Sequence, residues 1–265
     1  MPELPEVETI IRHLKPRLTG RKILDMSSNT PRIFRDHKSF SEVRKQVLNK
    51  KIESIERAGK NILLHLSGNT CLAIHLMMTG KLLIDPQEES RHDRFVMELS
   101  GPTRLVLNDI RKFGRCRVVA DPKALGGVDA LSLNFETLKY LLGSRKTPIK
   151  VFLLNQSLVA GIGNIYADEI LWQAGIHPLR RIDALDNKEI KSLFCAIKKV
   201  LMLAIKKGGT SSRDYRKPDG SKGAYYKIRK VYQRTGEKCR RDGAKIQRIV
   251  IGGRSSHFCP KHQKL

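Results

Sequence analysis

The 265-residue sequence predicts an α+β protein in which most strands precede most helices. Between residues 22 and 119, apolar runs of four to six residues alternate with turn-forming residues, a pattern that fits the strands of a sandwich or barrel. From residue 133 onwards the apolar residues recur with a helical period. The stretch DPKALGGVDALS separates the two patterns, so we expect one domain at 1–120, a linker at 121–132 and a helical domain beyond it.

Eight apolar runs form the predicted strands, and turns such as SGN, TGK and SGP separate some of them. The runs are KILDM, KIESIE, NILLHL, CLAIHL, KLLI, RFVMEL, RLVLND and RCRVV. A helix precedes them, from about Pro5 to Leu18, because apolar residues share one face there and Gly20 can end it. The residues of that face are Val7, Ile10, Ile11, Leu14 and Leu18.

The composition indicates a polyanionic partner. Lysine and arginine number 51 against 26 acidic residues, which gives a net charge of +25 and a pI of about 10.1. Ribosomal and membrane-surface proteins share such an excess, so charge alone does not choose among them. No apolar run reaches the roughly 18 residues of a membrane span, and the acidic N-terminus does not fit a secretory signal. The five cysteines, an odd number, argue for a reducing cytoplasm rather than a disulfide framework.

The N-terminal stretch MPELPEVE carries a candidate nucleophile. If Met1 is removed, Pro2 becomes a free amine. An α-amino group with a pKa near ~8 is deprotonated far more often at neutral pH than a lysine near ~10.4. Such a secondary amine attacks a sugar aldehyde carbon to give an iminium, which favours elimination at the neighbouring carbons, and Glu3 is placed to carry protons. Alternatively, Pro5 and Glu6 simply begin a helix, which explains the residues before them poorly.

The string PELPEVET resembles the N-terminus of the formamidopyrimidine-DNA glycosylase/endonuclease VIII family of base-excision repair enzymes, and later motifs share the resemblance. It implies a β-sandwich with a catalytic N-terminal helix, a helix–two-turn–helix domain at 133–234 and a β-hairpin zinc finger at 235–265. The implied activity is a bifunctional DNA glycosylase and AP lyase. Pro2 attacks the sugar carbon that bears the damaged base, Glu3 moves protons, and β,δ-elimination cuts the strand.

Five residues of the N-terminal half acquire roles from the resemblance. Taken alone, Lys60 in RAGKNILL is a solvated lysine and His75 in IHLMMTG a core histidine. In the family, the lysine supports catalysis at the backbone of the damaged nucleotide, and the histidine contacts a phosphate. Met78, Arg111 and Phe113 stand where the family fills the gap left by a flipped-out base, with Arg111 facing the orphaned base. The residues flanking Arg111 differ from the family's usual proline and arginine, whereas the inserting residues match.

In the helical half, GIGN places a glycine turn before a helix, whose free N–H groups form an anion site. The string NQSLVAGIGNIYADEILWQAGIHP resembles the family's helix–two-turn–helix, in which Asn164 holds the phosphate next to the lesion. The resemblance implies further DNA contacts for Glu6, Lys150, Tyr232 and Arg254. Other helices are expected after Asn134, at Thr147-Pro148, and from Asp186 to Gly208.

The segment 208–234 is rich in glycine, serine and lysine, with interleaved tyrosines. Its composition alone fits a disordered surface loop. In formamidopyrimidine-type members, a loop like this follows the long helix and closes over the flipped base. The resemblance therefore favours oxidised purines, such as 8-oxoguanine and formamidopyrimidines, over oxidised pyrimidines.

The C-terminal string KCRRDGAKIQRIVIGGRSSHFCPKHQKL resembles the family's zinc finger, which has two CxxC pairs. The ligand positions are occupied here by Cys239, Asp242, Cys259 and His262, with sixteen residues between the two pairs. Zinc accepts thiolate, carboxylate and imidazole, so we expect one structural zinc ion, weakened by the hard carboxylate. The alternative is a finger that has lost its metal and folds through hairpin packing.

The predicted partner is double-stranded DNA containing oxidised bases or abasic sites, bound by a monomer in the bacterial cytoplasm or nucleoid. Two alternatives stay open: an endonuclease VIII-like enzyme for oxidised pyrimidines, and a catalytically silent DNA- or RNA-binding protein. Net charge and GIGN fit the silent protein equally well, whereas PELPEVE and the set Met78, Arg111 and Phe113 do not.

Overall fold

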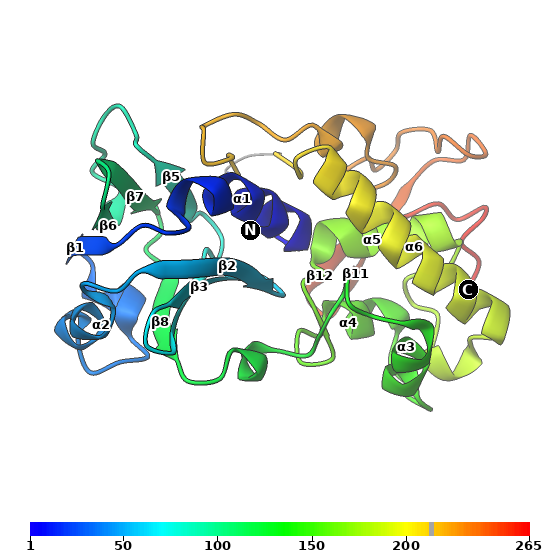
Figure 1. The fold of residues 1–265 in the computed structure, drawn as a ribbon. Helices are drawn as coiled ribbons and strands as arrows, with labels where there is room; N and C mark the ends of the chain where they lie inside the picture. The colour runs from blue at the N-terminus through cyan, green and yellow to red at the C-terminus, as the bar shows by residue number, and fades with distance from the viewer. Residues whose placement is uncertain (212–214) are drawn as a thin grey trace. The chain divides into compact units, whose positions relative to one another are not determined.

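The computed structural model describes residues 1–211 and 215–265 (Figure 1). The chain divides into two compact units, of which the first holds residues 1–125 and 207–226 and the second holds 126–206 and 227–265. The segment expected to cap the flipped base is thereby divided between the units, and its residues 212–214 lie outside the described part of the chain.

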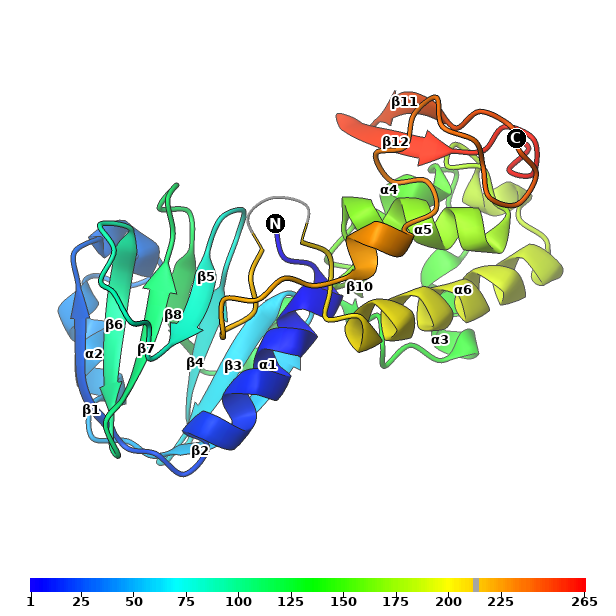
Figure 2. The same ribbon diagram turned by 90° about the horizontal axis from the view of Figure 1, so that it is seen from above.

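Two four-stranded antiparallel sheets make up most of the first unit (Figure 2). Their strand orders are β1-β6-β7-β5 and β2-β3-β4-β8. Side chains from both sheets share one apolar core, as the sandwich interpretation predicts. The strands are β1 Ile23–Ser28, β2 Ile52–Ala58, β3 Asn61–Leu66, β4 Thr70–His75, β5 Lys81–Ile84, β6 Asp93–Leu99, β7 Thr103–Asn108 and β8 Arg115–Val119.

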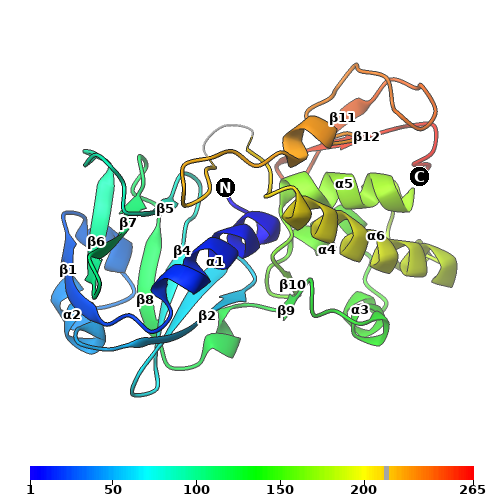
Figure 3. The ribbon, with the colours of Figure 1, turned by 45° about the horizontal axis from the view of Figure 1, so that its top comes forward.

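Helix α1, Leu4–Leu18, lies along β2 and β3 and contributes its predicted apolar face to the same core (Figure 3). It begins one residue earlier than expected, because Glu3 is its N-cap and forms a capping box with Glu6. Further helical segments of this unit are η1, Pro31–Phe34, α2, Phe40–Val47, and η2, Pro122–Leu125.

Residues 207–226 pack on the first unit rather than on the helical one, to which the sequence assigns them. The side chain of Tyr215 joins the core that contains the apolar face of α1. The backbone N–H of Thr210 donates to the Glu6 carboxylate at 2.6 Å. These contacts are non-local, so the helical period could not reveal them.

The second unit is mainly helical, and its longer helices begin where the sequence predicts. Asn134 caps the first of them by accepting the N–H of Thr137, and Asp186 caps the last through a reciprocal pair of bonds with Glu189. The helices are α3 Phe135–Leu142, α4 Ile149–Leu154, α5 Asn164–Ala174, η3 Ile182–Ala184 and α6 Asn187–Lys206, while η4 Tyr225–Ile228 begins in the first unit and ends in the second. A short parallel pair, β9 Val128–Asp129 and β10 Val159–Ala160, accompanies them.

The chain ends in the predicted hairpin. Strands β11, Gln247–Ile251, and β12, Arg254–Phe258, pair in antiparallel register around a Gly-Gly turn, and β12 packs on α5 (Figure 2). Within the described residues, no helix is long and apolar enough to cross a membrane.

Candidate active site and nucleic-acid interface

The first turn of α1 holds Pro2 and Glu3 in a fixed position. Pro2 is buried, and Glu3 is only 3% exposed. The backbone N–H of Glu3 donates to Glu6 Oε2 at 2.8 Å, which satisfies a donor that the helix leaves open. Glu3 therefore has a structural part as N-cap, while its carboxyl group stays adjacent in sequence to the Pro2 nitrogen.

Glu6 joins the N-terminus to the segment 207–226. One carboxylate oxygen accepts the N–H of Glu3, and the other accepts the N–H of Thr210. Gly209 precedes this contact with φ of +79°, and a Cβ there would lie 2.8 Å from Glu6 Oε1. The side chain is 1% exposed, so the DNA contact expected for Glu6 stays a prediction.

Lys60 and His75 lie near one another on the β2-β3-β4 sheet. Lys60 is mostly buried and follows Gly59 at the β2–β3 turn, while His75 pairs in register with Asn61. Burial lowers the pKa of His75 to about 4, and the positive charge of Lys60 adds to the effect. His75 Nδ1 accepts the N–H of Met77 at 2.9 Å, so the neutral ring carries its proton on Nε2.

Met78, Arg111 and Phe113, predicted as one set, do lie together. Arg111 Nη1 is 3.1 Å from the Met78 sulfur, and the guanidinium carbon of Arg111 lies 4.5 Å from the centre of the Phe113 ring. Met78 is 42% exposed, so its side chain is accessible to a partner. The set thus presents an apolar and cationic surface suited to stacked bases.

Asp109 organises the loop that carries Arg111 and Phe113, and sequence reasoning missed it. Its buried carboxylate accepts backbone N–H groups of Phe113 and Gly114, both at 2.8 Å, and of Arg111 at 3.2 Å. The hydroxyl of Thr79 donates to the same carboxylate. No local sequence signal marks Asp109, because its three N–H partners are set by the conformation of the folded loop.

Asn164 begins α5, as predicted, directly after the N-cap Gly163. Its Nδ2 donates to the carbonyl of Ser255 at 3.0 Å. An amide has a second Nδ2 hydrogen, so Asn164 suits an anion at this end of α5.

Three other predicted DNA contacts differ in their exposure. Arg254 opens β12 and is exposed. Tyr232 places its ring 5.4 Å from the His257 ring, and its backbone N–H donates to Glu169 at 3.0 Å. Lys150 is fully buried and forms an ion pair with Asp168. Arg254 is therefore accessible to DNA in this structure, whereas Lys150 is enclosed by protein.

Glu169 is a further buried acid that the sequence did not single out. Its carboxylate accepts the N–H groups of Lys230, Val231 and Tyr232 at 2.8–3.0 Å. Burial raises its pKa, although those three donors oppose the rise. The segment that carries Tyr232 is thus fixed to α5.

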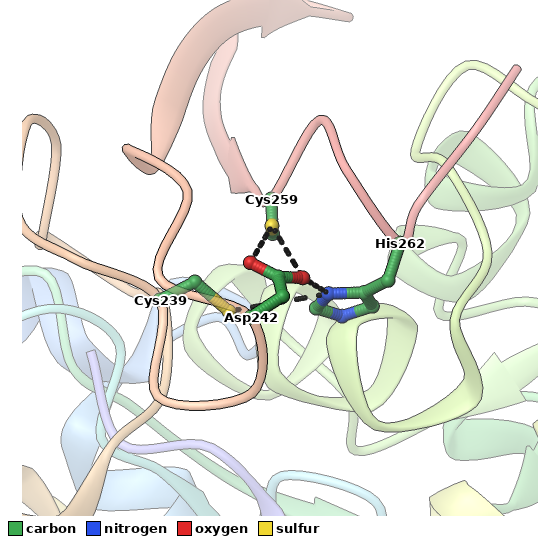
Figure 4. Close-up of side chains that lie close together, drawn as sticks. All are labelled: Cys239, Asp242, Cys259 and His262. Carbon is green, nitrogen blue, oxygen red and sulfur yellow. Dashed lines mark hydrogen bonds and ion pairs between the residues drawn. The ribbon is translucent and has the colours of Figure 1, made fainter.

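The four predicted metal ligands converge in the second unit (Figure 4). Donor atoms of Cys239, Asp242, Cys259 and His262 all lie within 4.8 Å of one another. Asp242 is 2.6 Å from His262 Nδ1 and 3.2 Å from the Cys259 sulfur. The hydrogen bond from His262 holds the pKa of the Asp242 carboxyl well below its usual range. Two thiols, a carboxylate and an imidazole at this spacing suit a closed zinc site.

Trp172, on α5, supports this cluster from outside. Its indole Nε1 donates to the Cys239 sulfur at 3.4 Å, and its ring meets the His262 ring edge-on at 5.4 Å. Residues beyond the ligands that orient them are a regular feature of protein metal sites.

These features define a class of protein: a nucleic-acid-binding protein with a potential amine nucleophile at its N-terminus and a small metal finger at its C-terminus. Three family domains match the chain. They are the formamidopyrimidine-DNA glycosylase N-terminal domain over 1–116, the formamidopyrimidine-DNA glycosylase H2TH domain over 127–216, and the zinc finger found in FPG and IleRS over 236–261.

Full-length relatives agree with these matches. The formamidopyrimidine-DNA glycosylase of Chloroflexus aurantiacus is 43% identical and covers 99% of this chain and 98% of its own. That of Carboxydothermus hydrogenoformans is 41% identical, with 100% of both chains covered. A solved complex of a Lactococcus lactis Fpg variant with Fapy-dG containing DNA has a TM-score of 0.91 at 36% identity, with 100% of both chains covered.

The chain belongs to the formamidopyrimidine-DNA glycosylase family and is a DNA glycosylase. The α+β architecture expected from the sequence is confirmed by the fold and its structural relatives. The zinc-finger match and the Cys/Asp/Cys/His cluster together fit one structural zinc ion.

Proposed function

We propose that this protein removes oxidised purines from duplex DNA and then cuts the strand at the resulting abasic site. The observation that carries the proposal is the start of α1, where the capping box with Glu6 holds Glu3, the residue next to Pro2. Since the chain spans the whole length of its glycosylase relatives, this arrangement supports Pro2 as the nucleophile and Glu3 as the proton carrier.

The chemistry requires removal of Met1, which frees the lone pair of the Pro2 nitrogen from the amide bond. That lone pair forms a bond to the sugar C1′ while the bond from C1′ to the base breaks, and the base leaves with the electron pair and takes up the proton that the bonded nitrogen releases. A proton from Glu3 to the ring oxygen opens the sugar and leaves an iminium. Loss of the C2′ proton then expels the 3′ phosphate, and loss of the C4′ proton expels the 5′ phosphate. Water finally hydrolyses the iminium.

The phosphate backbone is held by Lys60, His75, Asn164 and Arg254 in this proposal. Arg254 supplies a permanent charge and Lys60 an amine, whereas His75 and Asn164 supply neutral N–H donors. Met78, Arg111 and Phe113 fill the gap left by the flipped base. Lys150 is bound to Asp168 and to the carbonyl of Ser255, so it acts on DNA through these residues rather than by direct contact.

The substrate class is supported by what the relatives bind. Similar solved structures are complexes with Fapy-dG containing DNA and with carbocyclic 8-oxo-G containing DNA. We place the activity on the bacterial chromosome, in the cytoplasm, and expect a monomer to perform it.

Duplexes with a single 8-oxoguanine, formamidopyrimidine or thymine glycol test this proposal. We expect release of the first two bases with a nick that leaves phosphate on both ends, and slow release of thymine glycol. Preference for thymine glycol would support the endonuclease VIII-like alternative, and binding without release would support a catalytically silent protein.

A further inference from the structure

A buried charged set joins three elements of the second unit: Lys150 on α4, Asp168 on α5 and His257 on β12. Lys150 and Asp168 are 0% exposed and form an ion pair through one carboxylate oxygen. The other oxygen of Asp168 accepts the backbone N–H of His257 at 3.0 Å and its ring Nδ1–H at 2.8 Å. One carboxylate thus links both neighbouring elements to α5.

The carbonyl of Ser255 is a second meeting point. Lys150 Nζ and Asn164 Nδ2 both donate to it at 3.0 Å. Arg254 is the preceding residue of β12 and is exposed. Asn164 is therefore hydrogen-bonded to the residue that follows Arg254. Lys150 binds the same carbonyl of Ser255 and is also paired with Asp168.

We propose that Asp168 is a positioning residue for DNA binding. Through Lys150 and His257 it fixes the position of Ser255 on β12. Asn164 and Arg254 are thereby held in a fixed relative position in which both bind backbone phosphates. This inference rests on the proposed function, because it takes those two residues as phosphate contacts. Asp168 and Lys150 are enclosed by protein and act on DNA only through the residues they hold.

A structural role alone does not account for this choice of residues. A buried ion pair costs desolvation energy, and a well-packed apolar pair of similar size is often as stable or more so. A charged network instead fixes directions, because each donor and acceptor has a defined geometry. Glu169, the next residue of α5, is equally buried but holds the segment 230–232 instead of the hairpin.

The test is a set of salt titrations of binding to a duplex with one tetrahydrofuran abasic-site analogue. Wild type, Arg254→Ala, Asp168→Asn and the double variant are compared. Arg254→Ala should lower the slope of log affinity against log salt by about one unit. Asp168→Asn should lower it by the same amount, and Arg254→Ala should add nothing in the Asp168→Asn background.

Two control variants separate positioning from stability and charge. Glu169→Gln changes an equally buried acid, and Asp183→Asn makes the same change of net charge on an exposed acid. In both backgrounds Arg254→Ala should keep its full effect on the slope. Melting temperatures of all variants identify losses of stability.

The histidine gives an independent readout if Asp168→Asn does not fold. His257→Asn keeps an N–H near the Nδ1 position, so Arg254→Ala should still lower the salt slope by about one unit in this background. In the His257→Ala background, Arg254→Ala should lower the slope by less. If Arg254→Ala has no effect in the wild type, the proposed phosphate contact fails. If its effect is full in wild type and unchanged in Asp168→Asn, or in His257→Ala, the positioning role is refuted.

Discussion

His75 is a phosphate contact without a charge in this account. Its burial and the neighbouring positive charges of Lys60 and Arg115 lower its pKa to about 4, and the N–H of Met77 occupies Nδ1. A neutral ring offers one N–H donor to a phosphate but releases no counterion by charge neutralisation.

We therefore predict that His75→Gln weakens DNA binding at every salt concentration and leaves the salt slope unchanged. Arg254→Ala, which removes a permanent cation, is the matched comparison and should lower the slope by about one unit. Titrations with a tetrahydrofuran duplex measure both. A slope that falls by about one unit in His75→Gln would mean that the histidine binds DNA in its charged form.

Stability should depend on pH through the same histidine. The folded-state pKa near 4 lies below the ordinary value near ~6.5, so the unfolded chain takes up the proton first. The contribution of neutral His75 is complete above about pH 6.5 and declines as pH falls towards 4. His75→Gln should flatten this part of the curve of melting temperature against pH. A His75→Gln curve that keeps the wild-type slope between pH 6.5 and 4 would contradict this role.

At the scale of elements, Asp109 fixes the backbone conformation of the loop between β7 and β8. Its carboxylate accepts three backbone N–H groups of the loop, and Lys112 in the middle adopts a positive φ of 57°. Such a conformation is costly for a residue with a side chain and persists because its surroundings hold it. The wedge formed by Arg111 and Phe113 is therefore ordered before DNA arrives.

Phe113→Ala should impair discrimination between damaged and undamaged duplex more than overall affinity, because the proposed role of the ring is to fill the gap left by the flipped base. Asp109→Asn should reproduce much of this loss although it leaves the wedge side chains intact, since an amide cannot accept the same three N–H groups. Competition binding with the two duplexes measures the ratio of affinities. Asp109→Asn with wild-type discrimination would show that the loop needs no such anchor.

The elements themselves were largely predictable. The eight apolar runs became eight strands because each run is too short for a helix and some are bounded by turn-forming residues, and Asn134 and Asp186 cap helices as their residue types suggest. Helix α2 was missed although Ser39 caps it by accepting the N–H of Glu42. Only two of its residues are buried, so the sequence has no extended apolar face from which this helix could be predicted.

For the whole molecule, the zinc finger makes the clearest physical prediction. Beyond the ligands, the hairpin's apolar core is small, so metal affinity should contribute directly to its folding. Elemental analysis of protein purified without chelator should find about one zinc per chain. Metal-free protein that keeps full activity after extensive chelation would reject the site.

Trp172 gives a second readout of the metal, because it is the single tryptophan of the chain and contacts Cys239 and His262. Its fluorescence should change in step with zinc release during titration with a chelator. Trp172→Phe should abolish the signal while the protein still binds zinc. Zinc loss without any change in the wild-type fluorescence would contradict the observed geometry.

The sites were predictable to different degrees for a physical reason. The four metal ligands and the pair Arg111 and Phe113 are close in sequence or follow a fixed spacing, so a pattern could identify them. Asp109, Asp168 and Glu169 look like ordinary acids in the sequence, and only the fold reveals which N–H groups they accept. Residues 207–226 likewise join the first unit through non-local burial that no local period records.

The most direct test of the central claim is the position of the covalent adduct. Borohydride reduction during reaction with an 8-oxoguanine duplex should trap one protein–DNA adduct. Peptide mapping should place it on Pro2, and the intact mass should show that Met1 is absent. A chain that retains Met1 has an amide at this nitrogen and should bind the duplex without adduct or strand cleavage. An adduct on Lys60 or Lys150 would contradict the account.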